Sequence, residues 1–429
     1  MNKKDGYVVD TTYPAFFYKE MQPLWLNTVI NFLGFKAIDI TKSFSYLELA
    51  CATGTNLLVC AINYPEGYFV GVDFNKDHID KAKQSAQSLG LKNIEFIHCD
   101  FSAFLEKNIL KFDFIVNHGT FSWISPAHQK NILEIVSQSL NDLGIFYLHY
   151  MCYPGSADLL PVQKLLNLVD QHNQASSLDS IETGKKLFCD LNDAGAFIDH
   201  PKIEAVFKTL EQRPAYLAHE FLTDYWQPQY SVDVHHQVHQ AAQLAYLGSA
   251  NPCENMDSIS IPLKIQKIIH DTQAPALKEY LKDLARDAKQ RADIFQRKPA
   301  AFKNADHLRV INQIDFKLLA KAPQNSGIRF KTVIGEIKAP KEIIAPLIEC
   351  LSKKEISFRE LLTLPAFKNN PIFLVETIFL MMNAHYVHPC SSTAEQVDQN
   401  KVNRFNQIMK KDKIQLRIMK DCATAIDSN

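Results

Sequence analysis

The chain has 429 residues, of which 46% are hydrophobic and 22% charged, and its formal net charge is −1. This length predicts two or three domains with material for a sizeable core, and the composition is typical of a globular protein in water. The almost neutral charge argues against a nucleic-acid-binding surface spread over the whole chain, and we expect no nucleic-acid partner.

The cysteines and the apolar segments indicate where the protein is found. The nine cysteines are scattered and form no C-x-x-C pair, which predicts reduced thiols rather than a disulfide framework or a zinc site. The start, Met1–Gly6, leads into no apolar run, so no signal peptide is expected. The most apolar later segment, Pro371–Met382, is too short and too polar to cross a bilayer. We therefore expect a cytoplasmic protein without a membrane span.

The first 43 residues predict an N-terminal helical lid. Apolar side chains recur at roughly helical spacing between Phe17 and Leu33. Pro14 is expected to open this helix and Gly34 to close it.

Residues 44–190 predict an α/β domain with a parallel sheet, because strand-like runs alternate with helical ones and such units pair through right-handed crossovers. The expected strands are Tyr46–Ala50, Tyr68–Val72, Ile94–His98, Phe112–Asn117 and Ile145–Tyr150. The expected helices are Asn56–Ala61, Lys76–Leu89, a short one around Phe104, and Pro126–Leu140.

The pattern changes after Pro154-Gly155. Residues 156–300 are mostly helical in character and are broken into short pieces by prolines. We expect a helical domain at 191–305 and a winged-helix-like domain at 306–429, where helices at Ile343–Leu351, Ser357–Leu362 and Pro371–Ala384 precede an aromatic-ended segment.

The loop between the first expected strand and helix, Glu48–Asn56, is the first candidate binding site. Its small residues let the backbone pass close to a ligand, and the N–H groups of the following helix can hold an anion. The candidate residues in this loop are Glu48, Ala50, Cys51, Ala52, Gly54 and Asn56.

Three further positions follow the next strands. Asp73, followed by Phe74, can accept hydrogen bonds from both hydroxyls of a ribose. Asp100 can accept from the amino group of adenine, and the Phe101 ring can lie against the base. The run Asn117-His118-Gly119 stands where a methyl donor and its acceptor would meet.

The loop alone does not distinguish S-adenosylmethionine (SAM) from a dinucleotide, because enzymes that use NAD share the strand–loop–helix–acid layout. Glu48 just before the loop and Asp100 after the third strand favour SAM. The absence of the first and third glycines of a dinucleotide fingerprint also counts against NAD. Together these features predict SAM as the cofactor, with S-adenosylhomocysteine as its product.

The segment from Tyr13 to Gly155 resembles bacterial class I methyltransferases that carry a methyltransferase regulatory domain. The best-known members are rickettsial protein lysine methyltransferases that act on an outer-membrane protein. The most distinctive match is the run from His118 to Ile124, and a second match lies at Trp226–Tyr230. The chain departs from the family in having Ala50 where glycine is usual, Gln22-Pro23 in the N-terminal helix, and Met151-Cys152 after the fifth strand.

The resemblance implies a Rossmann-like class I methyltransferase domain followed by mostly helical regulatory and C-terminal domains. It also implies transfer of methyl groups to exposed lysines of a protein substrate, such as a surface or outer-membrane protein. A homodimer is among the expected states. A lysine acceptor must be deprotonated, so an aromatic channel would suit it. The residues expected to form its walls or to act on the acceptor are Tyr13, Phe17, Asn117, His118, Phe121, Trp123 and Tyr153.

Two other functions remain open from the residues. One is a small-molecule N- or O-methyltransferase with a helical lid, and the other is a SAM-binding interaction protein without turnover. The His235-His236-x-x-His239 run has metal-ligand spacing but no third ligand, so we expect a solvated face and no metal.

Overall fold

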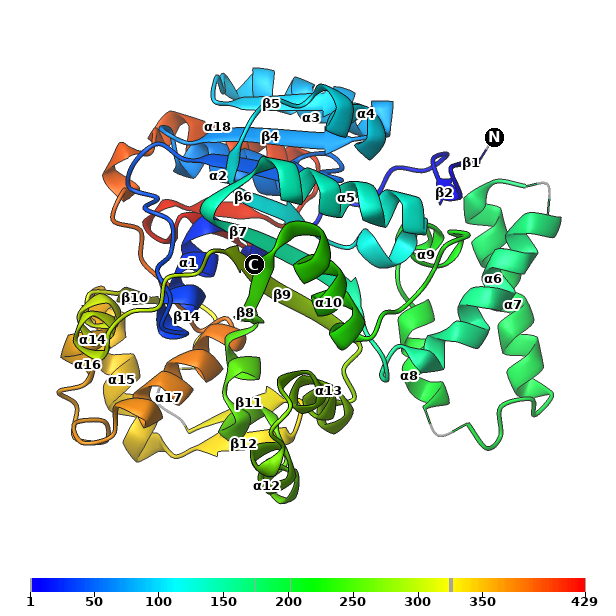
Figure 1. Cartoon of the computed structure of the whole chain (residues 1–429). Helices are drawn as coiled ribbons and strands as arrows, with labels where there is room; N and C mark the ends of the chain where they lie inside the picture. The colour runs from blue at the N-terminus through cyan, green and yellow to red at the C-terminus, as the bar shows by residue number, and fades with distance from the viewer. Residues whose placement is uncertain (1, 174, 201, 324–326, 429) are drawn as a thin grey trace.

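A seven-stranded sheet forms the centre of the computed structural model, which describes residues 2–173, 175–200, 202–323 and 327–428 (Figure 1). The strand order is β5-β4-β3-β6-β7-β9-β8, and β9 runs antiparallel to both of its neighbours. The strands in chain order are β3 (Ser45–Leu49), β4 (Tyr68–Asp73), β5 (Ile94–His98), β6 (Phe112–Asn117), β7 (Leu140–Met151), β8 (Leu244–Ser249) and β9 (Gln290–Arg297).

The predicted parallel sheet and its class I Rossmann-like fold are confirmed. The five predicted strands are β3 to β7, and the helices that connect them are α2 (Thr55–Asn63), α3 (Lys76–Leu89), α4 (Phe101–Lys107) and α5 (Pro126–Ser139). Local signals set their ends: the Asn75 side chain accepts the backbone N–H groups of Asp77 and His78 at the start of α3, and Gly90 adopts the left-handed conformation that ends it.

Side chains alternate between the two faces of the sheet and enter two separate cores, because successive residues of a strand point in opposite directions. Tyr46 and Tyr147 belong to the core that α1 (Pro23–Phe32) and α2 cover. Leu47 and Phe146 belong to the core on the opposite face, which α5 and α10 (Ser231–Ala242) cover. The sheet is thus buried on both faces.

The N-terminal segment differs from the predicted helical lid. A two-stranded hairpin, β1 (Lys3–Lys4) and β2 (Tyr7–Val8), is followed by extended backbone, a short turn η1 (Lys19–Met21), and a helix that begins only at Pro23. The physical reason is that side chains of the α/β domain capture this backbone: the Tyr13 N–H donates to Nε2 of His78 at 3.2 Å, and the Tyr18 N–H donates to the Asn56 amide oxygen at 2.9 Å.

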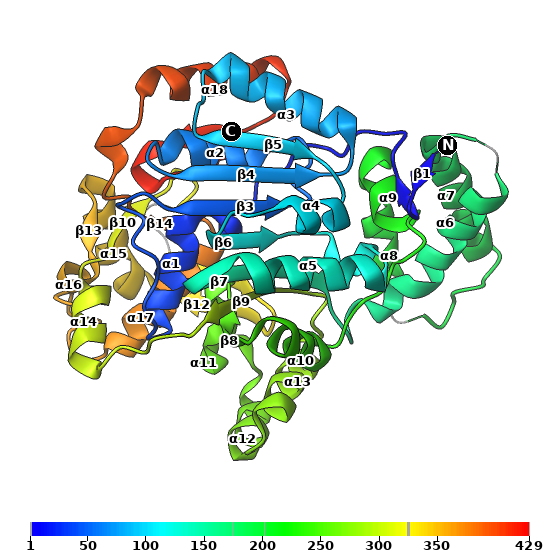
Figure 2. The same cartoon turned by 45° about the horizontal axis from the view of Figure 1, so that its top comes forward.

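Most of residues 156–300 is helical, as predicted. Four of its helices form a cluster beyond one end of the sheet, beside the N-terminus (Figures 1 and 2). They are α6 (Leu160–His172), α7 (Ser177–Asp193), α8 (Ile203–Leu210) and α9 (Pro214–Phe221), preceded by η3 (Ala157–Leu159). The remaining helices are α10, η4 (Pro252–Asn255), α11 (Asp257–Ser260), α12 (Leu263–Asp271) and α13 (Pro275–Arg286).

The region expected as a helical domain, 191–305, also contains β8 and β9, which complete the central sheet and were not predicted. Strand β9 pairs with β7 along almost its whole length, from Gln290 opposite Met151 to Gln296 opposite Ile145. The sheet therefore joins residues from both predicted domains.

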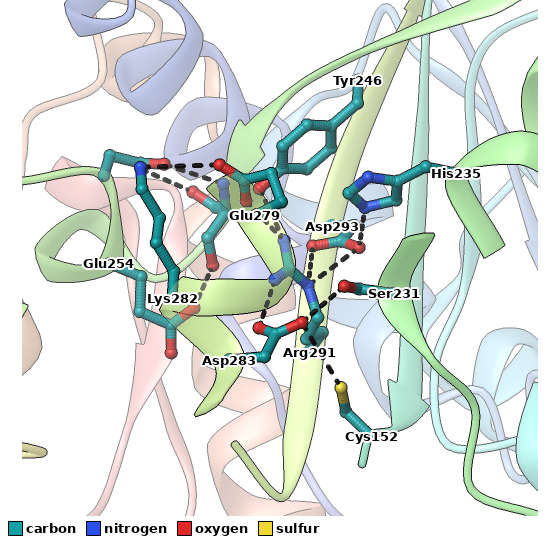
Figure 3. A network of polar contacts seen from close by, with 12 residues as sticks. Cys152, Ser231, His235, Tyr246, Glu254, Glu279, Lys282, Asp283, Arg291 and Asp293 are labelled. Carbon is teal, nitrogen blue, oxygen red and sulfur yellow. Dashed lines mark hydrogen bonds and ion pairs between the residues drawn. The ribbon is translucent and has the colours of Figure 1, made fainter. Parts of the chain in front are cut away.

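A buried ionic network holds β9 against the helices of the same region (Figure 3). The guanidinium of Arg291, which is 4% exposed, contacts the carboxylates of Asp283 on α13 and Asp293 on β9. His235 on α10 bonds to Asp293 at 2.8 Å and stacks on Tyr246. His235 is thus half-buried and paired, which corrects its expected place on a solvated face, whereas His236 and His239 are exposed.

The C-terminal region forms a small unit against α1. Strand β10 (Asp315–Leu318) lies between β13 (Ile356–Ser357) and β14 (Val387–Pro389). The predicted helices correspond to α15 (Lys341–Lys353), α16 (Phe358–Leu361) and α17 (Pro371–Asn383). Elements not predicted are α14 (Asn304–Asn312), the hairpin β11 (Ile328–Thr332) and β12 (Gly335–Ala339), η5 (Ala394–Gln396), α18 (Gln399–Lys411), η6 (Lys420–Cys422), and the hairpin β15 (Arg417–Met419) and β16 (Thr424–Ile426). Across the described ranges, no helix has the length and apolar character needed to span a bilayer.

Candidate functional site

The loop that follows β3 is folded tightly around small residues. Ala50, Ala52 and Gly54 all have positive φ angles, of 62°, 46° and 73°. A Cβ atom on Gly54 would lie 2.5 Å from the Phe96 ring, so only glycine fits there without a rearrangement. Alanine at positions 50 and 52 is strained in this conformation, which costs about 1–3 kcal/mol per residue. The loop thus keeps the backbone path of a glycine-rich loop at an energetic cost.

A cavity opens above this loop at the carboxyl ends of the parallel strands, with an empty volume of about 1140 Å³ including its mouth. We call it the first cavity. Its lining includes most of the predicted site residues: Tyr13, Glu48, Ala50, Cys51, Ala52, Asn56, Asp73, Phe74, Asp100, Phe101 and His118.

Glu48 supplies an unpaired acceptor to the first cavity. Its side chain is 5% exposed, and Oε2 has no hydrogen-bond partner in the described part of the chain. Burial, and then the nearby charge of Asp73, raise the pKa of the Glu48 carboxyl well above its usual value. A buried carboxyl with a free oxygen is costly unless a ligand satisfies it. An ammonium group would do so, and that is the group expected at the methionine end of SAM.

Asp73 has one backbone donor on each of its oxygens. Oδ2 accepts the N–H of Ala52 at 2.9 Å, and Oδ1 accepts the N–H of Asn75 at 2.8 Å. Because a carboxylate has about four acceptor positions, each oxygen retains one for a further donor. Asp73 can therefore shape the loop and bind two hydroxyl groups at once.

The far end of the first cavity fits an aromatic base. Asp100 caps α4 by accepting the N–H of Ala103 through Oδ1 at 2.8 Å. Phe101 lies edge-on to His128, and both line the cavity. The predicted role of Asp100 and Phe101 toward adenine is compatible with these contacts and stays a prediction.

Two predicted cofactor residues do not line either cavity described here. Asn117 is fully buried, and its Nδ2 donates to the Leu49 carbonyl at 3.0 Å, so it braces β6 against β3. Gly54 packs against Phe96 behind the loop. Both positions support the cavity from below instead of facing into it.

His118 lies at the centre of an aromatic stack. Its ring is sandwiched between Tyr18, with centroids 3.7 Å apart, and His149, with centroids 4.0 Å apart. Its Nδ1 is 2.8 Å from the hydroxyl of Tyr147. Burial, and next the neighbouring His149, lower the pKa of His118 well below its usual value, so the ring is neutral at neutral pH.

A second cavity adjoins the first at His118 and Gly119, with an empty volume of about 2140 Å³ including open solvent. Tyr7, Tyr13, Phe16 and Tyr18 line both cavities. A carboxylate from α9, that of Glu220, also lines the second cavity, together with Trp123 and Tyr216. Trp123 is 4% exposed and donates its indole N–H to the Glu220 carbonyl at 3.2 Å.

Three residues of the expected aromatic wall lie elsewhere. Phe121 is fully buried in the core under α5, and Phe17 lines neither cavity. Tyr153 stacks on Tyr230 with centroids 4.8 Å apart. The reason is that residues 151–153 pair with Gln229, whose N–H donates to the Met151 carbonyl and whose carbonyl accepts the Tyr153 N–H. This pairing moves Tyr153 out of the wall.

The sequence interpretation missed several residues around His118 and Glu220. Tyr147 and His149 are two residues apart on β7, so both side chains point to the same face of the sheet. The sequence contained this period-two signal. Tyr7, Tyr18 and Tyr216 carried no such signal, because they come from extended segments or a short helix. No cluster of three or more potential metal ligands occurs in the described part of the chain.

Two family models and several known proteins match parts of this chain. A family model described as a methyltransferase domain matches residues 40–205, and one described as a predicted methyltransferase regulatory domain matches residues 213–297. An uncharacterized protein of Synechocystis sp. is 28% identical over 96% of this chain and 82% of that protein. An uncharacterized protein of Rickettsia prowazekii is 30% identical over 50% of this chain, and the matched region covers only 41% of that relative.

Among solved structures, PKMT2 from Rickettsia typhi has a similar fold. It superposes with a TM-score of 0.66 at 19% identity, covering 89% of this chain and 77% of that one. The same protein in complex with AdoHcy superposes with a TM-score of 0.67.

Proposed function

The chain belongs to the SAM-dependent methyltransferases that carry a methyltransferase regulatory domain, and we propose that it methylates lysine side chains of a protein substrate. Its cofactor is SAM, and S-adenosylhomocysteine is the product. The regulatory region contributes β8, β9 and the wall that contains Glu220, so we further propose that it helps to select the acceptor.

The residues present fit SAM, and we propose the following contacts. The free oxygen of Glu48 would accept the ammonium group, and the N–H groups at the start of α2 would face the carboxylate. Asp73 would accept the ribose hydroxyls, while Asp100 and Phe101 would hold adenine.

The observation that carries the proposal is the junction of the two cavities at His118 and Gly119. We propose that the carboxyl groups and backbone N–H groups of the first cavity bind the cofactor. The second cavity would then receive a side chain presented by another protein. Its aromatic rings suit a methylammonium product. The resemblance to protein lysine methyltransferases and the shared fold with PKMT2 support a lysine acceptor.

When bound, SAM supplies a methyl group that its sulfonium already activates for displacement. The protein must therefore align the acceptor, exclude water and obtain a neutral amine. The aromatic walls lower the pKa of an entering ammonium group by desolvation. The Tyr18–His118–His149 stack and the Tyr147 hydroxyl keep His118 in one orientation beside the junction.

The proposal is tested by incubating the purified protein with methyl-labelled SAM and fractions of bacterial surface and outer-membrane proteins. We expect label on lysine side chains, mapped by mass spectrometry, and no label with the Asp73→Ala variant. Labelled metabolites in the absence of any labelled lysine would instead identify a small-molecule methyltransferase. Binding of SAM without transfer to any acceptor would identify a non-catalytic protein.

A further inference from the structure

Glu220 lies at the C-terminal end of α9 inside a ring of tyrosines. Tyr7, Tyr13, Tyr18 and Tyr216 line the second cavity together with Glu220. The charge of Glu220 also contributes to the raised pKa of these four hydroxyl groups. The rings also contact one another: Tyr13 lies 6.4 Å from Tyr216 between centroids. Phe16 lies 5.9 Å from Tyr216 and 6.2 Å from Tyr18. Glu220 thus shares the wall of the second cavity with these five aromatic rings.

This carboxylate has no cationic partner among the described residues. The other two acids of the second cavity are paired: Glu20 with Lys19 at 3.0 Å, and Asp158 with Lys202 at 2.8 Å. Tyr216 donates a hydrogen bond to the Glu220 carboxylate, whereas the indole N–H of Trp123 donates to the Glu220 backbone carbonyl. Glu220 is half-buried. An acid withdrawn from water without a counter-charge is costly, so such a site favours the binding of a cation.

Glu220 lies close to the place where the acceptor lysine would have to meet the cofactor. Tyr7, Tyr13 and Tyr18 of its tyrosine ring also line the first cavity, so the ring lies where the two cavities meet. An ammonium group among these rings would gain both the carboxylate and the faces of the aromatic side chains. Methylation of a lysine needs such a site, because the amine arrives protonated.

We propose that Glu220 binds the ammonium group of the acceptor lysine at this junction and takes up the proton that the amine must lose. This inference rests on the proposed function. The proton passes from the lysine nitrogen to the Glu220 carboxylate. The nitrogen lone pair then forms a bond to the methyl carbon as the carbon–sulfur bond breaks and its electron pair stays on sulfur. The products are a methylammonium group and the neutral thioether of S-adenosylhomocysteine.

The charges around Glu220 suit this role better than those around His118. Burial raises the pKa of Glu220 to about 7, whereas the pKa of His118 is well below its usual value. A base poised near neutral pH accepts a proton from an ammonium group more effectively than a weak one. The hydroxyl groups of Tyr7, Tyr13, Tyr18 and Tyr216, which line the second cavity with Glu220, all stay neutral at pH 7 because the pKa of each is raised.

The first test is a kinetic comparison of Glu220→Gln with the wild-type protein on the lysine substrate identified above. We expect kcat/KM to fall by about 100-fold or more, the usual contribution of a general base. The SAM dissociation constant should stay within about twofold. Glu220→Asp should recover part of the activity and keep an acid limb in the pH profile. Glu211→Gln, an exposed position shortly before α9, is the matched control and should behave as wild type.

The second test measures binding without turnover. Calorimetry with S-adenosylhomocysteine present would compare N-acetyl-lysine methylamide with its norleucine counterpart. Because Glu220 is ionised only above about pH 7, we expect the preference for the lysine probe to increase as the pH rises through 7. Glu220→Gln should lose both the preference and its pH dependence.

Two outcomes are distinguishable. If the wild-type protein methylates lysine but Glu220→Gln keeps the wild-type rate, pH profile and probe preference, the role of Glu220 is overturned and the proposed function stands. If the wild-type protein methylates no lysine, the proposed function fails and this inference fails with it. Unchanged thermal unfolding of Glu220→Gln and Glu220→Asp would exclude misfolding as the cause of a loss.

Discussion

At the residue scale, single carboxyl groups serve the fold and the site at the same time. Asp73 is the clearest case, because each of its oxygens accepts one backbone N–H and has room for one more donor. Asp100 likewise caps α4 through one oxygen only. Glu48 and Glu220 differ, since burial raises the pKa of both and each lacks a cationic partner among the described residues. At each of these two carboxyl groups, a bound cation would stabilise the protein.

We expect Asp73→Asn to weaken SAM binding by about 10- to 100-fold, because a hydrogen bond to a charged group contributes ~1.5–3 kcal/mol. The amide nitrogen of asparagine would also face the N–H of Ala52 or Asn75. Titration calorimetry with SAM measures the change. Asp77→Asn, an exposed position in the first turn of α3, is the control and should bind SAM normally. An unchanged affinity for Asp73→Asn would mean that Asp73 shapes the loop without binding the ribose.

At the scale of elements, β9 is the strand that joins the two matched regions of the chain. It pairs with β7 on one side and β8 on the other, and Arg291 ties it to α13 (Figure 3). Burial opposes ionisation of Asp293, yet Arg291 and His235 lower the pKa of Asp293 to about 2. The contribution of Asp293 to stability is therefore present above about pH 4 and is lost as the pH falls toward 2.

We expect Arg291→Met to reduce the free energy of unfolding by about 3–5 kcal/mol at pH 7, because two buried carboxylates would lose their counter-charge. The loss should shrink as the pH is lowered and these carboxylates become protonated. Chemical denaturation at several pH values measures both effects. Arg309→Met removes an exposed ion pair with Asp306 and should cost less than about 1 kcal/mol. A similar cost for the two variants would show that the network does not hold β9.

At the scale of the whole molecule, the methyltransferase sheet is completed by residues outside the methyltransferase match. Residues 40–205 supply β3 to β7, and residues 213–297 supply β8 and β9. The N-terminal segment and α9 then close the space above the carboxyl ends of the strands, where the two cavities lie. The site is therefore assembled from at least three parts of the chain.

We expect a chain that ends at residue 212 to fail to fold into a soluble domain. Strand β7 would become an unpaired edge, and buried side chains such as Phe146 and Tyr150 would lose the cover of β9 and α10. Expression, size-exclusion chromatography and circular dichroism of this fragment beside the full chain measure the outcome. A monomeric fragment that unfolds cooperatively and binds SAM would contradict the prediction and would make β8 and β9 dispensable.

The sequence by itself determined the parallel sheet from β3 to β7 and its helices. It also determined the loop that begins at Glu48, and the two acids, Asp73 and Asp100, that follow the next strands. These features follow from short-range signals: the alternation of strands and helices, capping residues such as Asn75 and Gly90, and acids placed directly after strands. Parallel strands bring their carboxyl ends to one edge, so local order along the chain was enough to bring these residues to one cavity.

Only the tertiary structure decided which distant segments meet. The last strands of the sheet, the extended path of residues 13–18, the Tyr18–His118–His149 stack and the place of Glu220 all depend on contacts between segments far apart in the chain. The same holds for Tyr153, which pairing with Gln229 moved away from the predicted wall. Such contacts arise from packing and shared hydrogen bonds, which leave no periodic trace in either segment alone.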